Sequence, residues 1–164
     1  MKKMLLLFVL AAPALVQGQS AQTLAQPAAF NVAGAFFALS VADVEASSKW
    51  YAEKLDLKVA MQMAKSKDTP AVKIMAGGGL IVELIEMEKA LPLSKAAPAI
   101  ASTEMVYGIF KAGVVVDDLD QVLATLKARD VPLFLGPFPA RGSSMRNLII
   151  KDNAGNLIQF FGRK

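Results

Sequence analysis

An internal repeat constrains the fold of this chain more than any other feature of its sequence. Residues 38–45 (ALSVADVE) resemble residues 113–120 (GVVVDDLD) at an offset of 75 positions. In both segments a β-rich run reaches an aspartate, Asp43 or Asp118, and apolar residues then recur at helical spacing. Each aspartate is expected to cap a helix, because its carboxylate can accept hydrogen bonds from N–H groups of the first turn.

Three strand-like runs follow each predicted helix. They are residues 57–63, 71–76 and 80–86 in the first half, and residues 133–138, 146–151 and 157–161 in the second. Glycines 77–79 predict a tight hairpin, because glycine tolerates positive φ. The order βαβββ therefore occurs twice, in modules of about 33–87 and 106–162. The linker between them, residues 88–105, contains Pro92 and Pro98.

Neither module is large enough to bury both faces of its own sheet. The pattern therefore predicts an α+β fold, in which the two βαβββ modules form a curved mixed, mostly antiparallel sheet with the helices outside. The concave face of such a sheet encloses a cavity, which is a typical place for a small-molecule site.

The composition excludes several kinds of chemistry. The 164 residues contain no cysteine and no histidine. Without cysteine there are no disulfides, thiolate nucleophiles or zinc–cysteine sites. Without histidine the chain lacks the commonest transition-metal ligand and the commonest general base near neutral pH, so a Ser-His-Asp triad is also excluded.

The N-terminus has the pattern of an export signal. Lys2 and Lys3 precede an apolar run, residues 4–16, that is short for a membrane span but suits a signal peptide. We expect residues 1–18 to be a signal peptide and residues 19–32 to be a flexible lead-in. Cleavage after Ala25 and an uncleaved membrane tether are the alternatives. The mature protein is then periplasmic or secreted, with no membrane association.

The remaining charge is nearly balanced. Without residues 1–18 the chain has 16 basic and 14 acidic side chains, and no stretch concentrates lysine and arginine beside aromatic residues. We therefore expect no nucleic-acid partner.

Four segments, residues 36–51, 82–86, 111–119 and 146–160, together resemble the vicinal oxygen chelate (VOC) superfamily. Its members include glyoxalase I, extradiol dioxygenases, and fosfomycin and bleomycin resistance proteins. The resemblance extends over residues 33–162, which it identifies as one glyoxalase/bleomycin-resistance-like domain. In catalytic members, histidine or glutamate side chains from the first and last strands of each module hold one divalent metal.

The resemblance places these ligand positions at Phe36, Glu83, Lys111 and Gln159. Only Glu83 keeps a residue type that the family uses, and one carboxylate does not hold a catalytic metal. The resemblance therefore implies that the family metal site has been lost and that the protein has no metal cofactor.

The same positions suggest a binding site in place of the metal. If the family fold holds, Glu83 and Lys111 point toward one central spot, where the ammonium can neutralise the carboxylate. We expect Phe36, Glu83, Lys111, Arg146 and Gln159 to form a ligand-binding pocket. Arg146 can grip an anionic ligand through its guanidinium group. Alternatively, Lys111 extends to solvent, Glu83 lies at a wet rim, and Arg146 is a structural residue at a strand edge.

The expected function is non-catalytic binding of a small molecule by an exported protein. One alternative is a VOC-type lyase, isomerase or dioxygenase, with an atypical metal site around Glu83 or metal-free chemistry assisted by Lys111. Another is a dimeric interaction module. Modules of this family pair within one chain or across a homodimer, and the sequence does not distinguish the two.

Overall fold

The computed structural model describes residues 34–101, 105–140 and 145–163. The predicted signal peptide and lead-in lie outside the described residues and stay predictions. None of the helices in the described ranges is long and apolar enough to cross a membrane.

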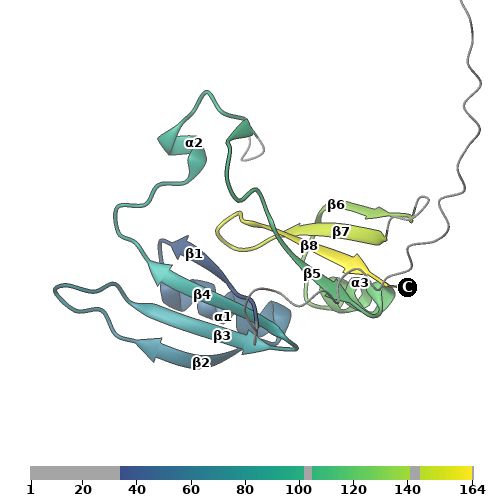
Figure 1. Cartoon of the computed structure of the whole chain (residues 1–164), viewed down its shortest axis with the longest axis horizontal. Coiled ribbons are helices and arrows are strands. Elements are labelled where there is room, and N and C mark those ends of the chain that lie inside the picture. The colour runs from purple at the N-terminus through teal and green to yellow at the C-terminus, as the bar shows by residue number, and fades with distance from the viewer. Residues whose placement is uncertain (1–33, 102–104, 141–144, 164) are drawn as a thin grey trace, which may run out of the picture. The chain divides into compact units, whose positions relative to one another are not determined.

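The first module has the predicted order of elements (Figure 1). It consists of β1 (Phe37–Val41), α1 (Val44–Leu55), β2 (Lys58–Met63), β3 (Val72–Gly77) and β4 (Leu80–Glu86). Its sheet has the order β1-β4-β3-β2. Strands β1 and β4 are parallel, whereas the other two pairs are antiparallel.

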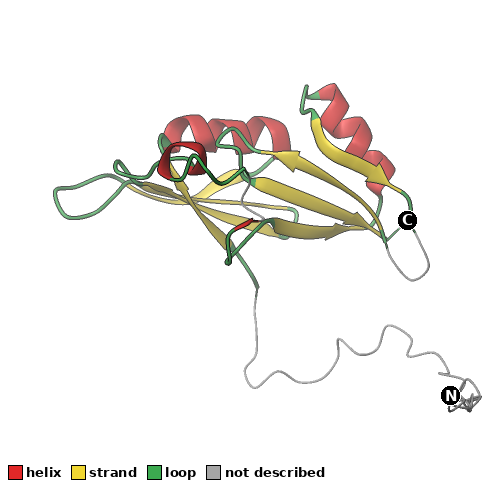
Figure 2. Cartoon of the chain, turned by 90° about the horizontal axis from the view of Figure 1, so that it is seen from above, coloured by secondary structure: helices red, strands yellow, loops and turns green. Residues whose placement is uncertain are grey.

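The second module repeats this arrangement. It consists of β5 (Ala112–Val116), α3 (Leu119–Ala128), β6 (Leu133–Phe138), β7 (Arg146–Lys151) and β8 (Leu157–Gly162), in the sheet order β5-β8-β7-β6. The parallel pair is β5 and β8. The predicted α+β fold with two βαβββ modules is confirmed, and its curved sheet consists of two four-stranded mixed sheets. Figure 2 shows the two long helices, α1 and α3, on one side of the strands.

The linker between the modules contains a short helix, α2 (Leu93–Ala96), that the sequence did not predict. Pro92 is its N-cap residue. Four residues are too few to show a helical period, and two nearby prolines favoured an irregular linker.

Local hydrogen bonds explain where the two long helices begin. The Asp43 carboxylate accepts a hydrogen bond from the backbone N–H of Ala46 at 2.8 Å. The Asp118 carboxylate accepts one from the backbone N–H of Gln121 at 3.0 Å. Both predicted caps are confirmed. The hairpin between β3 and β4 is confirmed as well, because Gly78 and Gly79 have φ values of 57° and 84°.

One apolar core includes side chains from both modules. Tyr51, Met75 and Leu84 from the first module and Leu148 and Ile158 from the second are almost fully buried in the same cluster.

A polar contact joins the modules beside this core. The buried Tyr51 hydroxyl donates to Asp152 in the β7–β8 turn at 3.0 Å. Helix α1 is therefore fixed to the second module as well as to its own sheet.

Candidate ligand-binding site

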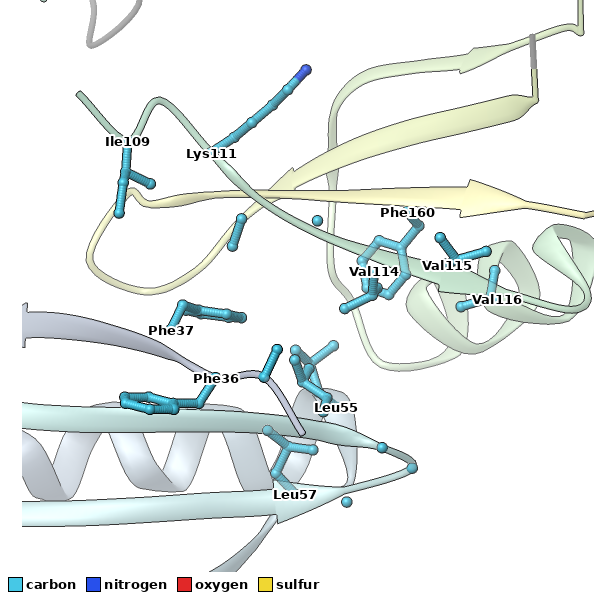
Figure 3. Close-up of a pocket in the computed structure, with 17 residues that line it drawn as sticks. Phe36, Phe37, Leu55, Leu57, Ile109, Lys111, Val114, Val115, Val116 and Phe160 are labelled. Carbon is cyan, nitrogen blue, oxygen red and sulfur yellow. The ribbon is translucent and has the colours of Figure 1, made fainter. Parts of the chain in front are cut away.

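A pocket of about 600 Å³ lies between the start of β1 and strand β5 (Figure 3). Its volume falls within the range of typical small-molecule sites. Phe36 and Phe37 form one wall with Leu55 and Leu57, which lie at the end of α1 and just after it. Phe160 on β8 and the glycine turn after β3 also line the pocket. The walls are therefore almost entirely apolar.

Strand β5 provides the opposite wall with all five of its residues. Successive side chains of a strand point to opposite faces, so no single face of β5 can contribute all five. The pocket therefore runs along the edge of the strand. Within the described residues β5 pairs with β8 alone, and this edge has no strand beside it.

Lys111 and Phe36 are the two predicted site residues that border this pocket. Phe36 is 65% exposed, so it lies at the surface of the pocket rather than in the core. Lys111 directly precedes β5, and its ammonium lies 5.3 Å from the centroid of the Phe110 ring. Figure 3 shows the Lys111 side chain extending away from Phe36 and Phe37.

Glu83 lies in the middle of β4 and does not line the pocket. Its register partners are Ala38 on β1 and Ile74 on β3, and it is half-buried. Register partners in a sheet share a face, so Glu83 has small or apolar neighbours on its face of the sheet.

Gln159 is buried on β8, opposite Gly113 on β5, and it too lies outside the pocket lining. Its amide nitrogen donates to the side-chain oxygen of Asn147 at 2.9 Å. This bond holds two neutral amides together on adjacent strands and fixes the orientation of Gln159.

Arg146 forms a two-point ion pair with Asp120 on α3. Its guanidinium nitrogens donate to the two carboxylate oxygens at 3.0 and 2.6 Å. Hydrogen bonding with Arg146 lowers the pKa of the Asp120 carboxyl below its ordinary value. The structure thus gives Arg146 a partner within the protein, and ligand binding by Arg146, Glu83 and Gln159 stays a prediction.

The side chains at the four positions that the resemblance gives for the family's metal ligands are a poor set for a divalent cation. Phe36 has no donor atom, the ammonium of Lys111 repels a cation, and Gln159 offers only one neutral carbonyl oxygen beside the single carboxylate of Glu83. The described part of the chain contains no group of three or more histidine, cysteine, aspartate or glutamate side chains that could hold a metal ion.

The sequence did not identify most of the pocket. Leu55, Leu57 and Ile109 line it, although none of them was a candidate. Leu55 was expected only as an apolar residue of a helix. The order of the elements contained a signal for the position of the pocket. In each βαβββ module the first strand has only the last strand as its neighbour, so the first strand lies at an edge of the sheet.

Comparisons with known proteins agree with this architecture. Residues 35–160 match the model of the Glyoxalase/Bleomycin resistance protein/Dioxygenase superfamily. No curated protein matches the chain.

Solved structures show the same fold at low sequence identity. A glyoxylase/bleomycin resistance protein/dioxygenase domain from Frankia sp. EAN1pec is 19% identical with a TM-score of 0.62, covering 82% of this chain and 94% of that one. The antibiotic-binding protein TnmS3 from Streptomyces sp. CB03234 is 18% identical with a TM-score of 0.57, covering 84% and 100%.

A third structure with this fold is a variant of the fosfomycin resistance protein FosX from Listeria monocytogenes, in complex with Mn(II) and a dihydroxypropylphosphonic acid. It is 14% identical with a TM-score of 0.58, covering 82% of this chain and 95% of that one. The family model matches most of the chain, and the repeated βαβββ order and these structural neighbours agree with it. The chain therefore belongs to the glyoxalase/bleomycin resistance protein/dioxygenase (VOC) superfamily.

Proposed function

We propose that this protein is a non-catalytic VOC-family protein that binds a small, mostly apolar molecule with one anionic group. The composition of the pocket between β1 and β5 carries this proposal. Of its 17 lining residues, Lys111 alone has a charged or polar side chain. Apolar walls with a single cation match an apolar ligand body with a single negative charge. TnmS3, a structural neighbour, is an antibiotic-binding protein.

Lys111 can serve this role by a change of rotamer. It is half-buried where it precedes β5, and its contact with Phe110 is a weak cation–π interaction near the surface. A lysine side chain has four rotatable bonds, so its ammonium can move toward an anion at the mouth of the pocket.

The proposal includes the absence of a metal. The absence of a metal is supported by the side chains at the four positions that correspond to the family's metal ligands, because Glu83 is the only carboxylate among them. A VOC-type enzyme with an atypical metal site around Glu83, or with metal-free chemistry at Lys111, is the alternative that metal analysis and activity screening test. A dimeric interaction module is the alternative if the pocket accepts no ligand.

Two fluorescent dyes test the function. The anionic 1-anilinonaphthalene-8-sulfonate and its neutral analogue N-phenyl-1-naphthylamine have nearly the same apolar body. Both are expected to bind the folded protein, and Lys111→Met is expected to weaken only the anionic dye. Lys67→Met, on an exposed loop, is the matched control. Val115→Trp, which enlarges a pocket residue, is expected to weaken both dyes. If Val115→Trp changes neither affinity, the dyes do not occupy this pocket and the proposal fails.

We also propose that the protein is exported, on the strength of Lys2, Lys3 and the apolar run at residues 4–16. The mass of the mature protein purified from its native cells tests this. A chain that begins at Gln19 supports export with cleavage after Gly18, and a full-length chain in the cytoplasm contradicts it.

A further inference from the structure

We propose that the ligand of this pocket is a short extended peptide that adds a strand to the free edge of β5. This inference rests on the proposed function, since it concerns the same pocket, and it goes further by naming the chemical class of the ligand. The peptide's main chain pairs with β5, and its C-terminal carboxylate binds Lys111.

The free edge of β5 is the first observation behind this inference. Strand β5 forms its ladder with β8 on one side, and within the described residues no strand pairs with the other side. An edge strand presents a row of backbone N–H and C=O groups, which is a template for another extended chain. The pocket runs along this row, because all five residues of β5 line it.

The backbone groups along the edge of β5 favour a peptide over a purely apolar ligand. Gly113 and Val115 are exposed, so water can reach this edge of the strand. An apolar ligand that displaced this water would leave backbone groups without hydrogen bonds, at a cost in binding free energy. The amides of an extended peptide replace those hydrogen bonds. The apolar walls, which include Phe37 and Leu57, can then hold its side chains.

Charge complementarity fixes the direction of the peptide. Lys111 precedes the first residue of β5, Ala112, and it provides the pocket's single charged group. A peptide whose C-terminal carboxylate binds Lys111 therefore runs antiparallel to β5, with its N-terminal end near Val116. A strand rises about 3.3 Å per residue, so five residues of β5 match a peptide of about three to five residues.

The short side chains of β5 leave its edge open to a second main chain. Gly113 has no side chain, and a Cβ added there would make only an ordinary contact, at 3.7 Å, with the carbonyl oxygen of Gln159. The side chains of the sequence AGVVV point to the two faces of the strand, and none is long enough to cover the edge along which the peptide would lie.

Backbone N-methylation tests the pairing directly without changing the protein. The probe is N-acetyl-Val-Ala-Val-Ala-Val with a free carboxylate, and its affinity is measured by displacement of 1-anilinonaphthalene-8-sulfonate. One peptide is N-methylated at the odd-numbered residues and another at the even-numbered residues. In a paired strand alternate N–H groups point to the same side, so only one of the two peptides loses the hydrogen bonds to β5. That peptide is expected to lose at least about tenfold in affinity, whereas the other keeps most of it.

A second comparison tests the contact between the peptide's C-terminal carboxylate and Lys111. The C-terminal amide of the parent peptide is expected to bind several-fold more weakly than the free acid. In Lys111→Met this difference disappears, whereas in the control Lys67→Met it remains.

The outcomes separate this inference from the proposed function. If the dye binds but the parent peptide does not displace it, the peptide inference is overturned while small-molecule binding stands. Equal affinities of the two N-methylated peptides also overturn it, as does a protein dimer in which β5 is covered by a second copy. If neither dye nor peptide binds, both proposals fail.

Discussion

Lys54 and Arg129 each donate a side-chain hydrogen bond to the other's backbone carbonyl oxygen. The ammonium of Lys54 lies 2.5 Å from the Arg129 oxygen, and Nη1 of Arg129 lies 3.1 Å from the Lys54 oxygen. The two residues are 75 positions apart, which is the offset of the sequence repeat. Equivalent ends of α1 and α3 therefore contact each other reciprocally, and cations at both helix C-termini are favoured by the helix dipoles.

Removal of the Arg129 side chain is expected to weaken the contact between the modules. Arg129→Met loses the bond to Lys54 and the ion pair with Asp56, and the side chain of Arg129 is only 28% exposed. The free energy of unfolding should fall by about 1.5–3 kcal/mol, the usual range for hydrogen bonds to charged groups. Denaturant titration measures it. Lys127→Met on the exposed face of α3 is the control, and an equal loss in both variants would contradict this assignment.

Tyr51 forms the second contact between the modules. Tyr51→Phe removes the hydroxyl that donates to Asp152 and leaves the ring in place, so the stability should fall by about 1–2 kcal/mol. Tyr107 is fully exposed, so Tyr107→Phe should leave the stability unchanged. Thermal unfolding of the two variants gives this comparison. No difference between them would mean that the hydroxyl bond contributes nothing to the fold.

Tyr51 also makes the stability depend on alkaline pH. Its burial, and secondarily the Asp152 carboxylate, raise the pKa of the Tyr51 phenol far above its ordinary value. In the unfolded chain a tyrosine ionises near about pH 10. Above that pH the unfolded state loses a proton that the folded state keeps, so this group lowers the stability by about 1.4 kcal/mol per pH unit. Urea unfolding at about pH 9 and about pH 11 should show a steeper fall for the wild type than for Tyr51→Phe; equal slopes would contradict the raised pKa.

Most of the fold could be predicted from local patterns. Strands at 80–86, 133–138 and 146–151 agree with the structure residue for residue. Gly79 marks the start of the first of them, and Pro132 and Pro139 flank the second. Trp50 packs against Tyr51 at the core, with ring centroids 5.0 Å apart. Phe36, Phe134 and Phe138 are strongly hydrophobic, yet their exposed fractions are 65%, 45% and 43%. Hydrophobicity alone does not show which face of a strand is covered.

The site depends on contacts between distant residues, and the sequence could not supply them. Arg146 pairs with Asp120, which is 26 positions away, and a free arginine and a paired one look the same in sequence. The edge of β5 faces Leu55 and Leu57 only because the two modules pack together. Lys111 and Phe36 were candidates because the resemblance to the VOC family placed two of its ligand positions at these residues.

Metal analysis tests the proposed loss of the family's metal site. Protein purified from its native compartment should contain substoichiometric metal, and titration with Mn²⁺ should show no tight binding, because Glu83 is the only carboxylate at the four family positions. One metal ion per chain that is lost in Glu83→Gln would contradict this and favour the enzymatic alternative.

The location of the bound ligand tests the central claim most directly. We would record the ¹H–¹⁵N spectra of the protein during titration with 1-anilinonaphthalene-8-sulfonate. Chemical-shift changes should concentrate on the backbone amides of β5, on Phe36 and Phe37, and on the turn at residues 77–80. Changes that concentrate instead on Glu83 and Gln159, or on β2 and β6 with β5 unaffected, would contradict ligand binding in the pocket between β1 and β5.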